Sequence, residues 1–510
     1  MIRTVHEAIG AVETYSPAEE QFNRRRRTAG LVLAPLVFLA ILLMPIGGLS
    51  PQGHRMAAIM VTVIVLWVSE ALPMAVTAVL GPVLAVVLQV APARGALAPF
   101  ADPIIFLFIG SFMLAEAMFV HGVDRRIAYT ALSSRLVGSS APRILIAYGG
   151  VATFISMWIS NTATTAMMFP IGLAIVGHLF RHGGASDIQM RRFAIAMMLI
   201  TSFGASIGGM ATPVGTPPNL IGIGMIERIT AVHIDFFQWM AIGVPIVLVL
   251  FTFLAVYFHW TCVRGVSVGG GSAELVRDEL RKLGPVSVGQ RNVLIAFGVT
   301  VLLWTLPGFL AIFGFGDTAF SKGFQTAVPE GIAAMLGAFL LFLLPISWRK
   351  RKFTLTWEEA VRIDWGIVLL YGGGLAMGDL AFSTGLASWV GQSLTAWLPS
   401  HSTLALTIVF AGLAIILSEA TSNTASANMI VPVAIAVSGP AGVSPILPAL
   451  AATLGASMGF MMPISTAPNA IVYSSGYVPI TTMMKFGIAL DIVGFIVIVS
   501  FVTLIGPLLW

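Results

Sequence analysis

The tripeptide Ser-Asn-Thr occurs twice in this chain, and each copy lies inside a long apolar stretch. The copies occupy residues 160–162 and 422–424, which are 262 positions apart. The same offset of 262 separates Asp102, which opens the segment DPIIFLFIGSFML, from Asp364, which opens DWGIVLLYGGGLA. Because one offset relates two separate features, the sequence indicates an internal repeat.

Composition fixes the class of fold. The chain is 57% apolar and 10% charged, and stretches of membrane-spanning length recur from Leu31 to Leu509, so we expect an all-α polytopic membrane protein. The polar first 28 residues lack the apolar core of a signal peptide, so the first helix should be retained. In such a protein, a polar motif at membrane depth in each half is typical of a transporter with its site between the halves.

We predict about eleven transmembrane helices and two re-entrant hairpins. The helices are expected at 30–48, 55–71, 74–91, 102–122, 193–225 (broken), 236–258, 292–315, 327–346, 365–383, 444–476 (broken) and 480–507. The hairpins are expected at 143–178 and 403–439, each with one Ser-Asn-Thr copy inside it.

The distribution of basic residues predicts the orientation. With the N-terminus in the cytoplasm, 23 of the 27 Lys and Arg residues fall on the cytoplasmic side, and only Arg55, Arg94, Arg228 and Lys322 fall outside. The net charge of +5 therefore reports orientation and does not indicate a nucleic-acid partner. The C-terminus is then outside, and the two hairpins enter from opposite sides, which makes the repeat an inverted one.

A second broken element follows each hairpin. Its sequence is PVGTPPNLI at 213–221 in the first half and PISTAPNAI at 463–471 in the second. Two prolines so close together stop a helix, because they remove amide donors and clash with the preceding turn. Unpaired backbone groups at membrane depth must line a site or be buried in protein.

The polar groups of these elements indicate what the site binds. Asn161 and Asn423 bring amide groups, the neighbouring Ser and Thr bring hydroxyls, and helix N-termini favour an anion. No Lys or Arg occurs at 144–180, 193–227 or 363–484. A doubly charged anion would be poorly compensated there by dipoles alone, so a bound cation is expected, and we predict co-transported Na⁺ with no organic cofactor.

Several motifs resemble one known family, the divalent-anion/sodium symporters, over about residues 60–505. These motifs are WVSEALPMAVTAVLGP (67–82), FIGSFMLAEAMFVHGVDRRIA (108–128), LTWEEAVRIDWGIVLLYGGGLAM (355–377) and ASMGFMMPISTAPNAIV (456–472). Members of that family carry dicarboxylates, tricarboxylates or sulfate.

The resemblance implies which residues bind the cargo. The substrate-binding set would be Asn161, Thr162, Thr216, Ser422, Asn423, Thr424, Thr466 and Ala467. Related chains often have Pro-Pro after the Thr of the second broken element, whereas this one has Ala467-Pro468, a departure that could widen the pocket or alter substrate preference. One Na⁺ site would use Ser156, Ser160, Asn161 and Gly215, and the other Ser418, Thr421, Asn423 and Ser465.

The resemblance also implies a homodimer in a plasma membrane, the inner membrane of a bacterium, that works as an elevator, with a fixed scaffold and a moving transport part. The parts would be a cytoplasmic segment (1–28), scaffold (29–142 and 292–400), transport part (143–260 and 401–510) and a cytoplasmic linker (261–291), amphipathic at 274–282 and flexible at 269–271.

The leading hypothesis is Na⁺-coupled symport of C4-dicarboxylates such as succinate, malate or fumarate. A dicarboxylate exchanger and a sodium/sulfate symporter of the same fold remain alternatives. An integral-membrane enzyme is disfavoured because no His, Asp or Cys cluster occurs at membrane depth, and hairpins suit alternating access better than a channel. Glu419, three residues before Ser422, has either a structural role or a role in cation coupling.

Overall fold

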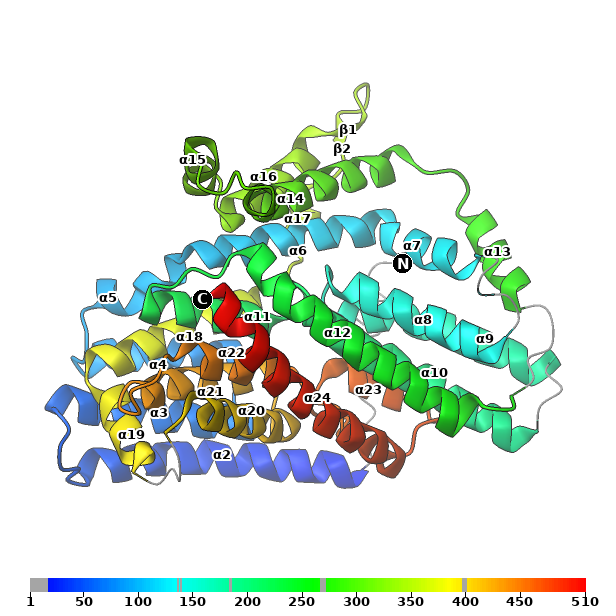
Figure 1. Cartoon of the computed structure of the whole chain (residues 1–510). Helices are drawn as coiled ribbons and strands as arrows, with labels where there is room; N and C mark the ends of the chain where they lie inside the picture. The colour runs from blue at the N-terminus through cyan, green and yellow to red at the C-terminus, as the bar shows by residue number, and fades with distance from the viewer. Residues whose placement is uncertain (1–16, 135–136, 138–139, 183–185, 267–271, 397–400) are drawn as a thin grey trace.

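A computed structural model describes residues 17–134, 137, 140–182, 186–266, 272–396 and 401–510. Helices make up most of this structure, and many of the long ones run roughly side by side (Figure 1). Within the described ranges, the only strands are β1 (Pro345–Ser347) and β2 (Lys352–Phe353), which pair antiparallel. The fold is therefore the all-α polytopic one that the composition predicts.

The described residues of the first half form eleven helices and one 3₁₀ turn. They are α2 (Pro17–Leu43), α3 (Pro51–Ser69), α4 (Met74–Val87), α5 (Ala93–Leu97), η1 (Ala98–Ala101), α6 (Pro103–His121), α7 (Val123–Leu132), α8 (Ala141–Ser156), α9 (Asn161–His182), α10 (Asp187–Gly209), α11 (Pro217–Thr230) and α12 (Phe236–Phe258).

The π-helical turn η2 (His259–Val263) and the short α13 (Ser272–Lys282) connect the halves. The second half has α14 (Val288–Ile312), α15 (Ala319–Ala327), α16 (Glu330–Leu343), α17 (Trp357–Ala360), α18 (Trp365–Ser383), α19 (Leu386–Thr395), α20 (Thr403–Ala420), α21 (Asn423–Ser438), α22 (Ile446–Gly455), α23 (Ala467–Tyr473) and α24 (Ile480–Leu509).

The predicted helices are present, and the bounds of α12 and α18 coincide with the predicted ranges 236–258 and 365–383. The largest difference is at α2, which begins at Pro17 and therefore includes part of the segment predicted to precede the first helix. The amphipathic stretch at 274–282 is helical within α13. The residues predicted to be flexible, 269–271, lie outside the described residues.

Nine described helices are long and apolar enough to span a membrane, or ten if the bent pair α15 and α16 counts as one span. The number differs from about eleven because α4 has only 14 residues and the break leaves α22 with 10. The 18-residue α20, predicted as a hairpin arm, is itself long enough to be counted.

The repeat is visible in how two helices begin. The Asp102 carboxylate caps α6 by accepting the backbone N–H of Ile104 at 3.0 Å, and the Asp364 carboxylate caps α18 by accepting the N–H of Ile367 at 3.2 Å. Carboxylates suit this position because the first amides of a helix have no partner within it. Two residues related by the repeat offset therefore both act as helix N-caps.

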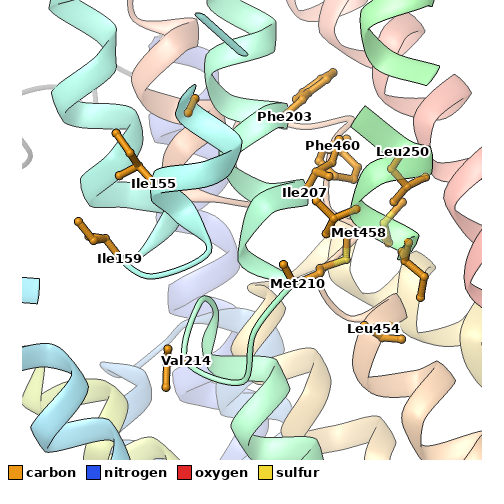
Figure 2. Packing of buried hydrophobic residues seen from close by; sticks show 14 of the residues in the cluster. Ile155, Ile159, Phe203, Ile207, Met210, Val214, Leu250, Leu454, Met458 and Phe460 are labelled. Carbon is orange, nitrogen blue, oxygen red and sulfur yellow. The ribbon is translucent and has the colours of Figure 1, made fainter. Parts of the chain in front are cut away.

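Buried apolar side chains from both halves pack together around the broken elements. Phe203 on α10 meets Phe460, in the segment between α22 and α23, with ring centroids 5.1 Å apart and the rings nearly perpendicular. Figure 2 shows these two rings beside Ile207 and Met458. Such close packing of edge against face favours one arrangement of the two segments, and it places both chain breaks within a common core.

Candidate functional site

Each Ser-Asn-Thr copy lies at a sharp turn between two helices. In the first half, α8 ends at Ser156 and α9 begins at Asn161, and the Ser156 hydroxyl donates to Asn161 Oδ1 at 2.8 Å. In the second half, the hydroxyl of Ser418 lies 2.7 Å from Asn423 Oδ1. Both residues of the second pair follow those of the first by 262 positions, so the internal repeat extends to individual hydrogen bonds.

The broken elements are held in shape by one asparagine each. Asn219 Nδ2 donates to the carbonyl oxygens of Gly209 at 2.9 Å and Thr212 at 2.8 Å. In the second half, Asn469 Nδ2 does the same with the carbonyls of Gly459 and Met462, both at 3.0 Å. Pro213 and Pro463 lack the amide hydrogen that would bond the carbonyls of Gly209 and Gly459 in a continuing helix. The fully buried asparagines pair with these two carbonyls instead, as buried backbone groups require.

Each broken element lies directly against the Ser-Asn-Thr turn of its own half. A Cβ atom added to Gly209 would lie 2.3 Å from Asn161 Oδ1, and one added to Gly459 would lie 2.9 Å from Asn423 Oδ1. Only glycine leaves room for these contacts. Each half therefore forms one compact unit in which a turn asparagine touches the end of the neighbouring broken helix.

The proposed Na⁺ ligands lie inside the protein. Ser156, Gly215, Ser418, Thr421, Asn423 and Ser465 are buried, and Ser160 and Asn161 are half-buried. Several oxygens lie close together around Ser418, since its hydroxyl is also 2.8 Å from the carbonyl oxygen of Ala456. The hydroxyl of Thr421 is buried with no hydrogen-bond partner among the described residues. Neutral oxygens gathered in this way suit a small hard cation.

The proposed substrate ligands are more accessible. Asn161, Thr162, Ser422, Thr424 and Thr466 are half-buried, Ala467 is exposed, and only Thr216 and Asn423 are buried. The Ser160 and Ser422 hydroxyls accept the backbone N–H groups of Ala163 and Ala425, and so cap α9 and α21. The positive ends of these two helices begin at the motifs, where they favour an anion.

The two units also join each other. α9 packs against α23, and α11 packs against α21 and α22, so elements of the first half lie beside elements of the second. Inside this contact, the Ser202 hydroxyl on α10 donates to Asn469 Oδ1. The equivalent oxygen of Asn219 has no partner among the described residues. The two halves are therefore similar in plan and different in detail.

Sequence reasoning missed two residues that shape the site, Asn219 and Asn469, and left the contacts of a third, Glu419, undescribed. Asn219 and Asn469 each donate to the backbone carbonyls of residues seven and ten positions earlier in the chain. The repeated Pro-Asn pair in 213–221 and 463–471 is the signal that could have shown this role. For Glu419, neither open role described its contacts with Phe460, Met461 and Ser465.

The fold and this site together define a class, a polytopic membrane transporter whose broken helices surround a duplicated polar site. A family model described as the sodium:sulfate symporter transmembrane region matches residues 25–510. The chain therefore belongs to the sodium:sulfate symporter family, in agreement with the resemblance that its motifs carry.

Curated relatives agree along almost the full chain. The sodium-dependent dicarboxylate transporter SdcS of Staphylococcus saprophyticus is 34% identical over 94% of this chain and 91% of its own length. SdcS of Staphylococcus aureus strain USA300 is 32% identical over the same shares.

Two solved structures share the fold at 13% sequence identity. The Alcanivorax borkumensis YdaH transporter has a TM-score of 0.52, covering 82% of this chain and 87% of its own. Neisseria gonorrhoeae MtrF has a TM-score of 0.50, covering 79% and 82%.

Proposed function

We propose that this protein couples the movement of Na⁺ to uptake of a C4-dicarboxylate such as succinate, malate or fumarate. The observation that carries the proposal is the repeated Ser–Asn hydrogen bond, which Ser156 and Asn161 make in one half and Ser418 and Asn423 in the other. Each asparagine belongs both to the predicted Na⁺ ligands and to the predicted substrate ligands. A cation that orders the asparagine side chain would thereby prepare it for the anion, which is a coupling between two ligands.

The choice of a dicarboxylate rests on the relatives, whose names specify sodium-dependent dicarboxylate transport. The family description names sulfate, so a sodium/sulfate symporter remains the second candidate. The absence of Lys and Arg from 363–484 favours cation coupling for either anion, because nothing else in that stretch could balance two negative charges. Transporter relatives also favour transport over an enzymatic role.

We further propose that the protein is a homodimer that works as an elevator in a bacterial plasma membrane. The helix packing supports the division into parts: α6 packs extensively on α16 within the scaffold, and α10 on α8 and α20 on α22 within the transport part. α19 on α21 is the most extensive contact between the two parts. These parts could therefore move as units relative to each other.

We also propose a cytoplasmic N-terminus and an outer C-terminus, and ion pairs and hydrogen bonds agree with the grouping of residues by side on which this orientation rests. Arg228, predicted to be outside, contacts Asp102 and Asp379, whose predicted positions are also at outer helix ends. Arg126, predicted to be cytoplasmic, contacts Gln290 and the carbonyl of Gly284 beside the predicted linker. Among the described residues, each of these two arginines contacts residues assigned to its own side.

The test is uptake of radiolabelled succinate into proteoliposomes under an inward Na⁺ gradient, with K⁺ in place of Na⁺ as the control. The proposal expects uptake only with Na⁺, and loss of uptake in Asn161→Ala and Asn423→Ala proteins that still fold. Uptake that ignores Na⁺ but requires internal succinate would identify an exchanger. Uptake of sulfate in place of succinate would identify the second candidate.

A further inference from the structure

Glu419 holds the second broken element in place. It lies on the last turn of α20, directly after Ser418, and is only 8% exposed. Its Oε1 accepts the backbone N–H groups of Phe460 at 2.6 Å and Met461 at 2.8 Å. Its Oε2 accepts the hydroxyl of Ser465 at 2.8 Å. One side chain therefore ties the turn that carries Asn423 to the segment between α22 and α23.

Every one of these contacts brings a donor to Glu419. Two backbone N–H groups and one hydroxyl point at its two oxygens, which is the arrangement that a carboxylate accepts. The carboxyl of Asp491, on α24, lies beside that of Glu419, but within the described residues no backbone N–H group or hydroxyl donates to it. Of these two acids, Glu419 is therefore the one whose oxygens meet donors from the segment between α22 and α23.

The first half has no such charge at the equivalent place. The offset of 262 that relates the turns places Met157 opposite Glu419. The offset of 250 that relates Asn219 to Asn469 places Gly215 opposite Ser465. In the first half the turn and the broken element are joined by a neutral hydrogen bond, which the Thr212 hydroxyl donates to the Met157 backbone carbonyl. The two units share one plan, but among the described residues of these turns only the second has a buried carboxylate.

We infer that Glu419 makes the two cation sites unequal, so that the site around Ser418, Thr421, Asn423 and Ser465 binds Na⁺ more tightly and fills first. This inference rests on the proposed function. The carboxylate touches Ser465 and follows Ser418 in the chain, so it lies within a few ångströms of any cation that those residues bind. At that range a fixed charge in a partly desolvated site changes cation affinity by about tenfold or more.

Glu419 is a positioning residue in this scheme, since its oxygens are occupied by the backbone and by Ser465. Its charge raises the affinity of the neighbouring site, and its hydrogen bonds keep the loop in place. Filling of the second site would then order Asn423 before the first site is occupied. The carrier would accept its two cations in a fixed sequence and not at random.

The experiment is to compare Glu419→Gln with the intact protein. Glutamine keeps the size and an acceptor oxygen but removes the charge. The readouts are the Na⁺ concentration for half-maximal succinate uptake, and the rise in melting temperature on Na⁺ titration without succinate. We expect the Na⁺ requirement to rise about tenfold in both, while the KM for succinate at saturating Na⁺ changes much less. Glu419→Asp keeps the charge, so its Na⁺ requirement should be closer to that of the intact protein.

Met157→Gln is the matched control, because it makes the same side chain at the repeat-related position without removing a charge, and its Na⁺ curves should not shift. Na⁺ curves of Glu419→Gln identical to those of the intact protein would overturn the inference. If Glu419→Gln does not fold, Met157→Glu takes over the test: it should lower the Na⁺ requirement, and an unchanged curve would again overturn the inference. Failure of the proposed function is distinguishable, because wild-type uptake would then ignore Na⁺.

Discussion

Arg228, near the C-terminal end of α11, forms an ion pair with Asp379 on α18. Its Nη1 also lies 3.5 Å from Asp102 Oδ2, at the start of α6. In the proposed division, α11 belongs to the transport part, whereas α6 and α18 belong to the scaffold. The ion pairs therefore fasten one part to the other, and an elevator movement would have to break them.

We predict that Arg228→Gln destabilises the protein in this conformation by about 1 kcal/mol, because a partly exposed ion pair contributes little more than that. The measurement is the midpoint of thermal unfolding in detergent. Lys322→Gln is the control, since its partner Asp317 is fully exposed and no change is expected. Equal midpoints for Arg228→Gln and the intact protein would show that the pairs do not hold the parts together.

A pH dependence is expected from His233, in the loop before α12. Hydrogen bonding to Glu227, and then to Glu330, raises the pKa of His233 to about 10. The raised pKa means that the stabilisation is fully present below about pH 6.5, the pKa of an unfolded His, and is lost as pH rises toward 10. The side chain is 55% exposed, so screening by water keeps the effect small.

The check is the melting temperature of intact protein and His233→Gln between pH 6 and 10. The difference between the two should be largest at the acidic end and should shrink as pH rises. A difference that stays constant over this range would mean that the charge of His233 does not contribute.

Gly209→Ala should impair Na⁺ coupling more than it impairs folding. The new Cβ would lie 2.3 Å from Asn161 Oδ1, so the asparagine has to turn away from its position beside Ser156. Gly459→Ala should act in the same direction but less strongly, because its Cβ would lie 2.9 Å from Asn423 Oδ1.

The matched control is Gly298→Ala on α14, where a Cβ meets nothing within 4 Å. Alanine in that helix should be neutral or stabilise by up to about 1 kcal/mol. Half-maximal Na⁺ concentrations for uptake should rise in the order Gly298→Ala, Gly459→Ala, Gly209→Ala. Any other order would contradict the contact of Asn161 with the broken helix.

Ser202→Ala should lower stability by about 1–3 kcal/mol, because it leaves the buried Oδ1 of Asn469 without its donor. Thr252→Ala is a fair comparison. Its exposed hydroxyl returns to the carbonyl of Leu248 within α12, and its loss should cost no more than about 0.5 kcal/mol. Thermal midpoints of the two variants decide the point, and similar values would argue against a bond that joins the halves.

Much of the fold is predictable from the sequence, because apolar length and prolines dictate where membrane helices run. The bounds of α12 and α18 and both turns at Asn161 and Asn423 follow from such local patterns. The short helices α15 and α19 were missed, since nine or ten residues between membrane spans leave little periodic signal.

The site is less predictable, because its details are contacts over long distances in the chain. The repeat identifies Asn161 and Asn423, but Glu419 meets Phe460 and Met461 some 40 residues later. Arg228 meets Asp379 from 151 residues away, and no local pattern marks either residue as the partner of the other. Hydrophobic periodicity decides which face of a helix is buried and does not decide which polar groups meet there.

The bond between Ser202 and Asn469 has a consequence for synthesis of the chain. The two residues are 267 positions apart. A ribosome that adds about 5–20 residues per second reaches Asn469 roughly 13 to 50 s after Ser202. During that interval α10 is already made, but α23, which will cover it, does not yet exist. The newly inserted first half must therefore wait in the membrane with a gap that only the last part of the chain can fill.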